Sequence, residues 1–401
     1  MAKLFIEDLD FRGKKVLLRA DFNVPLDGDG NITDTTRIEA TLPSIRYILD
    51  HGGALILMSH LGRPRGEPNP DLSLAPVAHA LTAILGKPVT LAANCIGDQV
   101  RAQVNALRPG DVLLLENLRF HRAEEHPEED PNFAQELSRY GSCYINDAFG
   151  AAHRKHSSTY TITQYFPGRA AAGYLLEKEI RFLGEALSQP RHPFYALIGG
   201  AKVSTKIGVI KALLQKTDRL LIGGGMAYTF LKAQDIPIGD SLVENELVPL
   251  AAQLLKEYRD HLVLPLDFLI ATTCSENAPI KQVSSAAGIP PGYQGLDIGP
   301  QTIVLFQKAL SDAQTVLWNG PLGVYELDRF AGGTLAIANY LATLQATTIV
   351  GGGDSIAAIN KAHVEDQISH LSTGGGASLE YIEYGTLPGI EALSEKTTPP
   401  I

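Results

Sequence analysis

The stretch Thr347-Thr-Ile-Val-Gly-Gly-Gly-Asp-Ser355 gives the clearest indication of how this chain folds. A β-branched run ends in three glycines, an aspartate and a serine, and helix-forming residues follow at 356–361. This order predicts a buried strand, a tight turn and the N-terminus of a helix. Unpaired backbone N–H groups and the positive end of the helix dipole gather at such a turn, where they bind anions. Glycine at a strand-to-helix turn also serves packing alone, so the weight of this stretch depends on repetition elsewhere.

The repetition is found throughout the second half of the chain, where four more apolar runs end in glycine-containing loops. These runs are residues 194–198, 219–222, 315–318 and 368–371, which precede Gly199-Gly-Ala, Gly223-Gly-Gly, Asn319-Gly-Pro and Ser372-Thr-Gly-Gly-Gly. Turn chemistry alone does not account for five such ends. They fit several loops that converge on one polyphosphate at the carboxyl edge of a sheet.

The first half of the chain alternates strands, polar loops and helices. Strands are predicted at residues 14–19, 54–59, 89–91, 112–115 and 143–146, with helices at 35–49 and 74–85. Polar loops follow four of these strands, at residues 20–25, 60–64, 116–120 and 147–156. This alternation predicts an α/β fold with a parallel sheet whose ligand-binding loops share one edge.

A predicted amphipathic helix at residues 174–187 marks a domain boundary, because the alternation of strands and helices starts afresh after it. A chain of 401 residues is long enough for two ordinary domains. We therefore expect domains at 1–173 and 189–385, an interdomain helix at 174–188 and a C-terminal segment at 386–401. The apolar residues of 387–393 are expected to pack against another part of the chain.

The composition, 45% hydrophobic and 19% charged, is typical of a soluble globular protein. The net charge of −10, without a long basic block, argues against nucleic acid as the main partner. The N-terminus does not resemble a signal peptide, and no run approaches the roughly 18 apolar residues of a membrane span. We expect a cytoplasmic protein with no membrane partner. Cys95, Cys143 and Cys274 lack CxxC spacing and are expected to be buried or half-buried thiols.

The standard nucleotide and catalytic fingerprints are absent. The sequence contains no GxxxxGK[ST], and Tyr228, Ile356 and Leu379 stand where GxGxxG needs its third glycine. It also lacks the protein-kinase motifs, HExxH and GxSxG. His153 and His156 could form a metal pair, but Arg154 and Lys155 between them favour anion binding or a plain solvated loop.

Arginine is concentrated in the first half of the chain. Residues 1–175 contain 13 Arg and 5 Lys, whereas the remainder contains 5 Arg and 11 Lys. Arg37, Arg63, Arg119 and Arg154 lie within or just after the polar strand-end loops. Because arginine binds carboxylate and phosphate through two parallel hydrogen bonds, these positions predict a pocket for a small, multiply anionic substrate.

Eight motifs, taken together and in order, resemble the phosphoglycerate kinase family. They are Asp21-Phe-Asn-Val-Pro25, His60-Leu-Gly-Arg-Pro64, Glu116-Asn-Leu-Arg-Phe120, Asn146-Asp-Ala-Phe-Gly150, Gly199-Gly-Ala-Lys-Val-Ser-Thr-Lys206, Trp318-Asn-Gly-Pro-Leu-Gly-Val-Tyr-Glu326, Gly351-Gly-Gly-Asp-Ser355 and Ser372-Thr-Gly-Gly-Gly-Ala-Ser378. The resemblance extends from about residue 4 to residue 393 without a missing block. Each motif alone is modest evidence, whereas eight in register are highly specific.

The resemblance implies two Rossmann-like domains that are joined by a hinge helix and close on each other. It assigns residues 1–173 to phosphoglycerate binding, 189–385 to nucleotide binding, and 386–401 to a segment that returns to the first domain. The implied reaction is reversible transfer of the 1-phosphoryl group of 1,3-bisphosphoglycerate to Mg-ADP, which gives 3-phosphoglycerate and Mg-ATP. Family members are typically monomers, and Mg²⁺ is the implied cofactor.

The resemblance also implies a set of site residues, position by position. The implied phosphoglycerate ligands are Asp21, Asn23, Arg37, His60, Arg63, Arg119 and Arg154. The implied nucleotide ligands are Lys202, Lys206, Gly295, Glu326, Gly352, Gly353, Asp354 and Ser355, with Asp354 also on the magnesium ion. Many relatives have threonine where this chain has Ser355; the hydroxyl is kept, so little change is expected.

Phosphoryl transfer depends mainly on positioning and charge stabilisation, and no general base is required because the attacking oxygen is already ionised. We predict that Arg37 and Lys206 flank the transferred group. Backbone N–H groups at the helix starts after Gly353 and Gly376 would complete the cage. Closure of the domains would exclude water, with residues 174–187 and 157–161 as hinge candidates.

Three of these assignments have plainer alternatives. Arg37 could form a helix-surface salt bridge with Asp34 or Glu39. Lys206 could point into solvent, although a cation in the first turn of a helix opposes the dipole and so suggests an anionic partner. Asp354 could serve only as a helix N-cap.

Two other classes of protein compete with a kinase. An NAD-dependent dehydrogenase should carry a complete GxGxxG followed by an acidic residue, and the sequence lacks one. A bilobal protein that binds an anion without turnover should have lost a contact to the reacting group, such as Arg37 or Lys206. Both residues are present.

Overall fold

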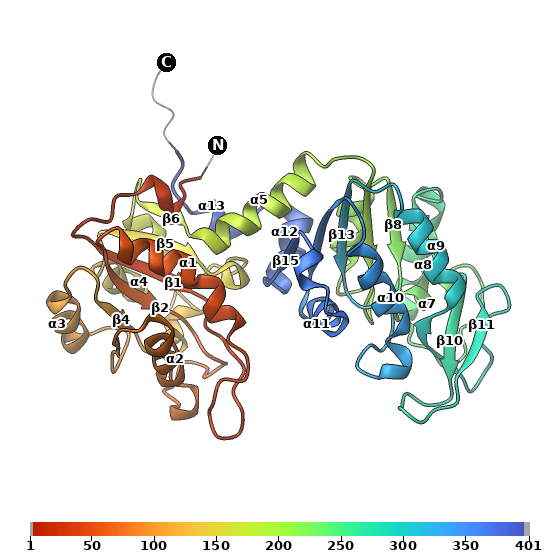
Figure 1. Ribbon diagram of the computed structural model, residues 1–401, viewed down its shortest axis with the longest axis horizontal. Helices are drawn as coiled ribbons and strands as arrows, with labels where there is room; N and C mark the ends of the chain where they lie inside the picture. Colours follow the sequence, from red (N-terminus) through yellow and green to blue (C-terminus); the bar gives the residue numbers. More distant parts are fainter. Residues whose placement is uncertain (1–2, 397–401) are drawn as a thin grey trace, which may run out of the picture. The chain divides into compact units, whose positions relative to one another are not determined.

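The computed structural model describes residues 3–396, which divide into two compact units (Figure 1). The first unit consists of residues 3–181 and 386–396, and the second of Phe182–Gly385. The division falls inside helix α5 (Tyr174–Ser188), after Arg181. Each unit contains a six-stranded parallel sheet flanked by helices, which confirms the predicted α/β fold class. No helix within the described range is both long enough and apolar enough to cross a membrane.

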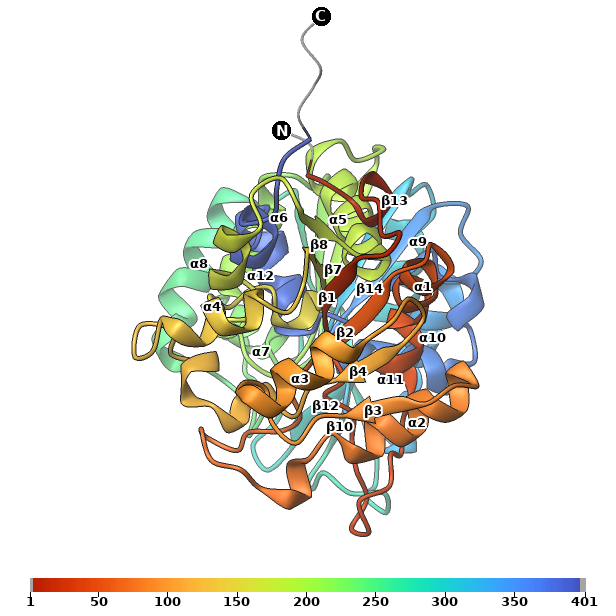
Figure 2. The ribbon, with the colours of Figure 1, turned by 90° about the vertical axis from the view of Figure 1, so that its left-hand side faces the viewer.

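The sheet of the first unit has the strand order β3-β4-β2-β1-β5-β6, and all neighbouring strands are parallel. Figure 2 shows β1, β2, β4 and β3 as successive neighbours. The strands are β1 (Lys15–Ala20), β2 (Ala54–Met58), β3 (Val89–Leu91), β4 (Val112–Leu114), β5 (Cys143–Asp147) and β6 (Ala170–Ala172). The helices are α1 (Thr36–Asp50), α2 (Ala75–Leu85), α3 (Asp98–Ala106), α4 (Asn132–Ser138) and α13 (Pro388–Glu391).

Burial on both faces of this sheet explains why its central strands are apolar throughout. Every residue of β2 is buried, and β1 is buried from Val16 onward. Successive side chains of a strand point to opposite faces, so a continuous apolar run requires cover on both. Helix α1 provides part of this cover, because Ile38, Ile45 and Ile48 lie on one face of the helix and are fully buried.

The parallel sheet of the second unit has the order β15-β14-β13-β7-β8-β9. Its strands are β7 (Phe194–Ile198), β8 (Arg219–Ile222), β9 (Leu262–Val263), β13 (Thr315–Asn319), β14 (Thr347–Gly351) and β15 (His370–Ser372). The helices are α6 (Ile207–Leu214), α7 (Ala227–Lys232), α8 (Val248–Glu257), α9 (Pro300–Leu310), α10 (Gly332–Leu341), α11 (Gly353–Ala362) and α12 (Gly376–Tyr384). All five predicted glycine-tipped runs are strands of this sheet, so their glycine ends share its carboxyl edge.

The second unit also contains a three-stranded antiparallel sheet that the sequence did not predict. Its order is β11 (Lys281–Ser284), β10 (Asp267–Ala271) and β12 (Gln294–Ile298). β11 is mostly exposed, and β12 contains a glycine and an aspartate, so neither shows a clear apolar pattern. Cys274 follows β10 and is exposed, so the expectation of a buried or half-buried thiol is wrong for this residue. Cys95 and Cys143 are buried.

Residues 386–396 pack within the first unit. Leu387, Ile390 and Leu393 are buried, and the Gly389 amide donates a hydrogen bond to Ala152 O at 2.8 Å. The Leu4 amide donates to Ser394 O, also at 2.8 Å. The last five residues of the expected C-terminal segment, 397–401, lie outside the described range.

Candidate functional site

Asp21 follows β1 directly and forms a salt bridge with Arg37 in the first turn of α1. The Arg37 Nη1 atom donates to Asp21 Oδ2 at 2.5 Å, and Asp21 is 9% exposed. Burial acts to raise the pKa of Asp21, but electrostatic interactions, with His60 at the acid pH where both groups titrate and with the guanidinium groups of Arg37 and Arg19, outweigh it and lower the pKa to about 2. Asp21 is therefore ionised at neutral pH, and the pair is fully charged.

The alternative partners of Arg37 are occupied elsewhere. Asp34 accepts a hydrogen bond from the Thr36 hydroxyl at 2.5 Å, and Glu39 accepts one from Thr35 at 2.6 Å. The Arg37 side chain is 37% exposed, so it is held at the sheet edge by Asp21 while part of its guanidinium reaches solvent. This geometry favours the strand-end interpretation of Arg37 over a helix-surface salt bridge.

Asn23 and His60 connect the loop after β1 with the loop after β2. The Asn23 side-chain oxygen accepts a hydrogen bond from the Gly62 amide at 2.8 Å. His60 Nδ1 lies 3.1 Å from Arg19 Nη2, and burial lowers the pKa of His60 well below its usual 6.5. The ring is therefore neutral at pH 7. Because a guanidinium only donates, Nδ1 is the acceptor and the ring proton lies on Nε2, available for an anionic ligand.

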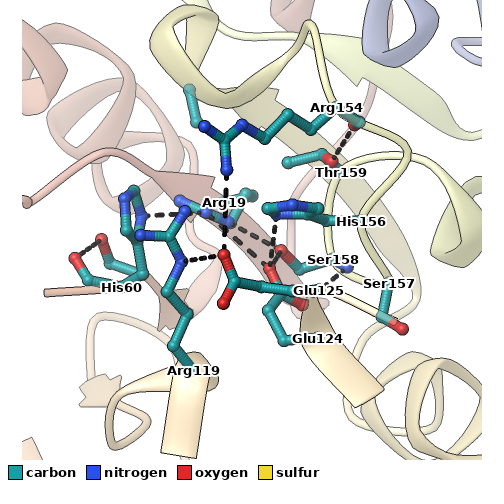
Figure 3. Close-up of polar contacts among 12 residues, drawn as sticks. Arg19, His60, Arg119, Glu124, Glu125, Arg154, His156, Ser157, Ser158 and Thr159 are labelled. Carbon is teal, nitrogen blue, oxygen red and sulfur yellow. Dashed lines mark hydrogen bonds and ion pairs between the residues drawn. The ribbon is translucent and has the colours of Figure 1, made fainter. Parts of the chain in front are cut away.

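Arg119 and Arg154 converge on one carboxylate, that of Glu125 (Figure 3). Arg119 Nε lies 3.2 Å and Arg154 Nη1 3.8 Å from the same oxygen, Oε1. Arg119 Nη1 also donates to Gly62 O at 2.8 Å, and burial lowers the pKa of this guanidinium. Two arginines around one carboxylate oxygen form a site that a substrate phosphate or carboxylate could also occupy. Arg63, in contrast, is exposed and forms no ion pair within residues 3–396.

Arg19 is the residue of this cluster that sequence reasoning missed. It lies within β1, is fully buried, and contacts His60 Nδ1 and the Ser158 hydroxyl. A charged side chain inside an otherwise apolar strand is expensive to bury without a partner. That cost was the signal available in the sequence, where an arginine stands one residue before the end of the run Lys15–Ala20.

The corresponding edge of the second unit is built mainly from backbone. The Gly200 amide donates to Pro321 O at 2.9 Å, and the Gly224 amide donates to Leu322 O at 3.1 Å. Gly224 has a φ of +67°, and a Cβ at this position would lie 2.6 Å from Gly200 N and 2.7 Å from Gly200 O. The loops after β7, β8 and β13 thus approach backbone to backbone, which only glycine permits.

The amino group of Lys206 lies between two of these loops rather than in solvent. It donates to Gly199 O at 2.7 Å and to Asn319 O at 3.1 Å. Burial lowers the pKa of Lys206 to about 8, although the nearby charge of Asp354 acts to raise it. Lys206 caps α6 instead of occupying its first turn, and its ammonium group is directed back to the carboxyl edge of the sheet.

A pocket of about 260 Å³ opens beside these loops and is lined by three of the predicted residues, Gly295, Glu326 and Asp354. Gly295 leaves room for a tyrosine, because a Cβ there would lie 2.0 Å from the Tyr228 hydroxyl oxygen. A larger groove of about 640 Å³ lies at the amino ends of β3 and β4 in the first unit and contains none of the predicted site residues. Of these two hollows, only the smaller pocket brings residues of the predicted nucleotide site together.

Helix α11 begins at Gly353, and its N-cap is Gly352, with a φ of +93°. Asp354 is exposed and makes no capping hydrogen bond, so the capping alternative does not describe it. Ser355 is fully buried, and its hydroxyl accepts a hydrogen bond from the Gly320 amide at 2.6 Å. In this structure the hydroxyl of Ser355 therefore holds the loop after β13.

Gly376 lies at the start of a helix, whereas Lys202 lies outside the pocket. Gly376 opens α12 after Gly375, whose φ of +55° makes the turn from β15. Its backbone N–H is thus at a helix start, as Gly353 is in α11. Lys202 is exposed and does not line the pocket, so the structure does not bring it together with Asp354 and Glu326.

His153 and His156 belong to no group of three or more possible metal ligands within residues 3–396, where the one such group is the exposed set His126, Glu128 and Glu129. Burial and the charges of nearby arginines lower the pKa of His156 to about 3. A neutral, buried histidine beside arginines fits a role in the anion-binding cluster.

Comparisons with known proteins agree along nearly the whole chain. A family model described as phosphoglycerate kinase matches residues 6–384. The chain is 53% identical to a phosphoglycerate kinase of Chlorobaculum tepidum, over 98% of this chain and 100% of that protein. It is also 53% identical to a phosphoglycerate kinase of Moorella thermoacetica, over 99% of this chain and 100% of the relative.

Solved structures show the same similarity in three dimensions. The structure of phosphoglycerate kinase from Coxiella burnetii superposes with a TM-score of 0.88 at 38% identity, covering 97% of this chain and 98% of the other. That of phosphoglycerate kinase from Pyrococcus horikoshii gives a TM-score of 0.84 at 31% identity, with the same coverage.

Proposed function

The chain belongs to the phosphoglycerate kinase family of phosphotransferases, and we propose how its residues perform that family's reaction. The reaction is reversible transfer of the 1-phosphoryl group of 1,3-bisphosphoglycerate to Mg-ADP, which gives 3-phosphoglycerate and Mg-ATP. The main observation behind the proposal is that one chain of this family contains two sheets with different carboxyl edges. One edge is rich in arginine and the other is rich in glycine.

The arginine-rich edge of the first unit binds phosphoglycerate. Arg119 and Arg154 already converge on a carboxylate oxygen, and Arg63 is exposed without a partner among residues 3–396. His60, as a neutral donor through Nε2, and Asn23 supply uncharged hydrogen-bonding groups. Asp21 orients Arg37 through the 2.5 Å contact. A substrate with a carboxylate and a phosphate offers enough negative charge to occupy several of these cations.

The glycine-rich edge of the second unit binds the nucleotide. Its loops offer backbone N–H groups at the starts of α11 and α12, where Gly352, Gly353 and Gly376 leave space for phosphate oxygens. Gly295 and Glu326 line the pocket for the rest of the nucleotide. Lys202 is exposed near this edge, and we assign it a contact made only when the nucleotide is bound.

Asp354 is the proposed protein ligand of Mg²⁺, carried as Mg-ADP or Mg-ATP. Its carboxylate is exposed at the pocket, forms no ion pair within the described chain, and offers the oxygen ligands that this ion prefers. When bound, the ion neutralises charge on the nucleotide phosphates. Ser355 contributes indirectly, because its hydroxyl fixes the Gly320 amide.

Arg37 and Lys206 stabilise the charge of the transferred group, and backbone N–H groups of α11 and α12 complete its surroundings. The phosphoryl group in transfer spreads negative charge over its equatorial oxygens, so fixed cations and amides lower the barrier. No general base is needed, since both attacking oxygens are already ionised. Transfer requires the two bound substrates to meet, so we propose that the units close on each other about α5 during turnover.

We also propose that the protein acts as a cytoplasmic monomer, which sedimentation and cell fractionation can test. A coupled assay tests the function itself by following ATP formed from acyl phosphate and ADP. ATP formation that requires both substrates and Mg²⁺ is the expected result. Reduction of a nicotinamide cofactor, or anion binding without turnover, would instead favour the dehydrogenase or the binding protein.

A further inference from the structure

A buried carboxylate lies behind the arginine cluster and has no part in the chemistry proposed above. Glu124 ends the short 3-10 helix Arg122–Glu124 and is 0% exposed. Its Oε1 accepts a hydrogen bond from the Ser158 hydroxyl at 2.6 Å, and its Oε2 accepts one from the Ser158 amide at 3.0 Å (Figure 3). Burying a carboxylate costs several kcal/mol unless it is paired, so its retention in this position requires an explanation.

Arg19 extends the contacts of Glu124 as far as His60. Arg19 Nε donates to the same Ser158 hydroxyl at 2.8 Å, and Arg19 Nη2 lies 3.9 Å from Glu124 Oε1. The same Nη2 atom lies 3.1 Å from His60 Nδ1. Since Arg19 is also fully buried, the negative charge of Glu124 and the Ser158 hydroxyl fix the plane of its guanidinium. The orientation of that plane in turn fixes the tautomer of His60.

Glu124 also anchors the segment that follows Arg154. Its backbone oxygen accepts a hydrogen bond from the Ser157 amide at 2.9 Å, while the Thr159 hydroxyl donates to Arg154 O at 3.0 Å. Ser157, Ser158 and Thr159 are all fully buried. These contacts hold the backbone beside Arg154, and the role of this segment as a hinge candidate stays a prediction.

We propose that Glu124 is a positioning residue for phosphoglycerate binding, acting through Arg19 on His60 and, through Ser158, on the buried segment 157–159 that holds the Arg154 backbone. This inference rests on the proposed function, because it concerns the same substrate site. Without the negative charge of Glu124, Arg19 loses its buried counter-ion and is held only by the Ser158 hydroxyl and the Ala20 carbonyl. The donor on His60 then loses its alignment, while the nucleotide site, built from other residues, does not change.

The test measures both Michaelis constants of Glu124→Gln, which keeps the volume of the side chain but removes its charge. We expect the KM for 3-phosphoglycerate to rise about tenfold, with the KM for Mg-ATP and kcat within about twofold of wild type. Glu129→Gln is the matched control, because Glu129 belongs to the same loop but is exposed and pairs with Arg122 at 2.6 Å. This control should leave both Michaelis constants unchanged.

Ser158→Ala provides a second variant that keeps the charge and removes only the bridging hydroxyl. A smaller rise in the same KM, about threefold, is expected, and the double variant should resemble Glu124→Gln because both changes break one network. Should Glu124→Gln fail to fold, Ser158→Ala decides alone.

Three results overturn the inference: an unchanged KM for 3-phosphoglycerate, equal rises in both KM values, or a loss confined to kcat. An inactive wild-type protein would overturn the proposed function instead. An active wild type with an unaffected, folded Glu124→Gln would refute only the positioning role.

Discussion

The candidate anion sites of the two units are built by different means. In the first unit the candidate site consists of side chains, and Arg37, Arg119 and Arg154 are paired with the protein's own carboxylates, Asp21 and Glu125. In the second unit the site consists of backbone amides that glycine brings close together, as at Gly200 and Gly224. Removing one charged side chain should weaken anion binding at a site built from side chains. Adding one methyl group to a glycine should weaken anion binding at a site built from backbone amides.

The largest expected effect is that of Arg37→Ala. Loss of one charge that stabilises the transferred group should lower kcat by about 10²–10³. Steady-state kinetics with both substrates measure this, and Arg12→Ala, at an exposed arginine of the same unit, is the control. Turnover near that of wild type would remove Arg37 from the mechanism and leave it a structural partner of Asp21.

Lys206→Ala tests the half-buried cation that donates hydrogen bonds to two loops of the second unit. We expect kcat to fall on the order of 10² and nucleotide affinity to weaken, while Lys211→Ala, at an exposed lysine of α6, should do neither. Because burial lowers the pKa of Lys206 to about 8, the amine is charged below that pH. In the wild type, kcat/KM for the nucleotide should therefore decline as pH rises through about 8. A flat profile from pH 7 to 9 would contradict this assignment.

Gly224→Ala adds a methyl group to the backbone-built site. The new Cβ would lie 2.6 Å from Gly200 N, and the φ of +67° is unfavourable for alanine. Strain of roughly 1–3 kcal/mol corresponds to about a ten- to hundredfold loss of nucleotide affinity. Calorimetric titration with ADP measures it. Gly28→Ala has open space around its Cβ and should bind ADP like the wild type; equal affinities for both variants would show that the backbone contact is unimportant.

Asp354→Asn distinguishes between two roles for this residue, as a ligand of magnesium or only as a residue that stabilises helix α11. The amide keeps the size of the side chain but loses the charge, so the Mg²⁺ concentration for half-maximal activity should rise roughly tenfold. Asp366→Asn, at another exposed aspartate of the second unit, is the control. The assignment fails if the magnesium titration curves of the two variants coincide.

The last prediction concerns stability. Each unit contains one buried aspartate whose pKa is raised. Burial raises the pKa of Asp147 in the first unit and of Asp297 in the second, each to about 7. The unfolded chain releases these protons near pH 4 and the folded chain near pH 7, so each group makes the protein less stable as pH rises between those values.

Substitution by asparagine should remove this loss of unfolding free energy. The loss amounts to roughly 1.4 kcal/mol for each unit by which the pKa is raised. Urea unfolding at pH 5 and pH 8 measures it: Asp147→Asn and Asp297→Asn should each reduce the difference in unfolding free energy between the two pH values. The control is Asp50→Asn, at an exposed position. A difference as large as that of wild type would show that the carboxylate in question is already ionised in the folded protein.

Features that depend on local patterns could be predicted from the sequence. Apolar runs predicted the strands, glycine predicted the turns at their ends, and arginines in the strand-end loops predicted an anion site. The parallel topology then predicted that Arg37 and Arg119, which follow different strands, lie at one edge. Eight motifs in register were enough to indicate the family, which the comparisons show.

Pairs of groups that are far apart in the sequence became visible only in the folded chain. Arg19 meets Ser158 and Glu124 more than a hundred residues away, and Ser355 meets the Gly320 amide instead of solvent. The Lys206 ammonium group points inward because it donates hydrogen bonds to carbonyl groups of two separate loops. The physical reason is that periodicity reports burial along a segment, whereas a buried polar contact is selected by whatever complementary atom the folded chain brings within about 3 Å.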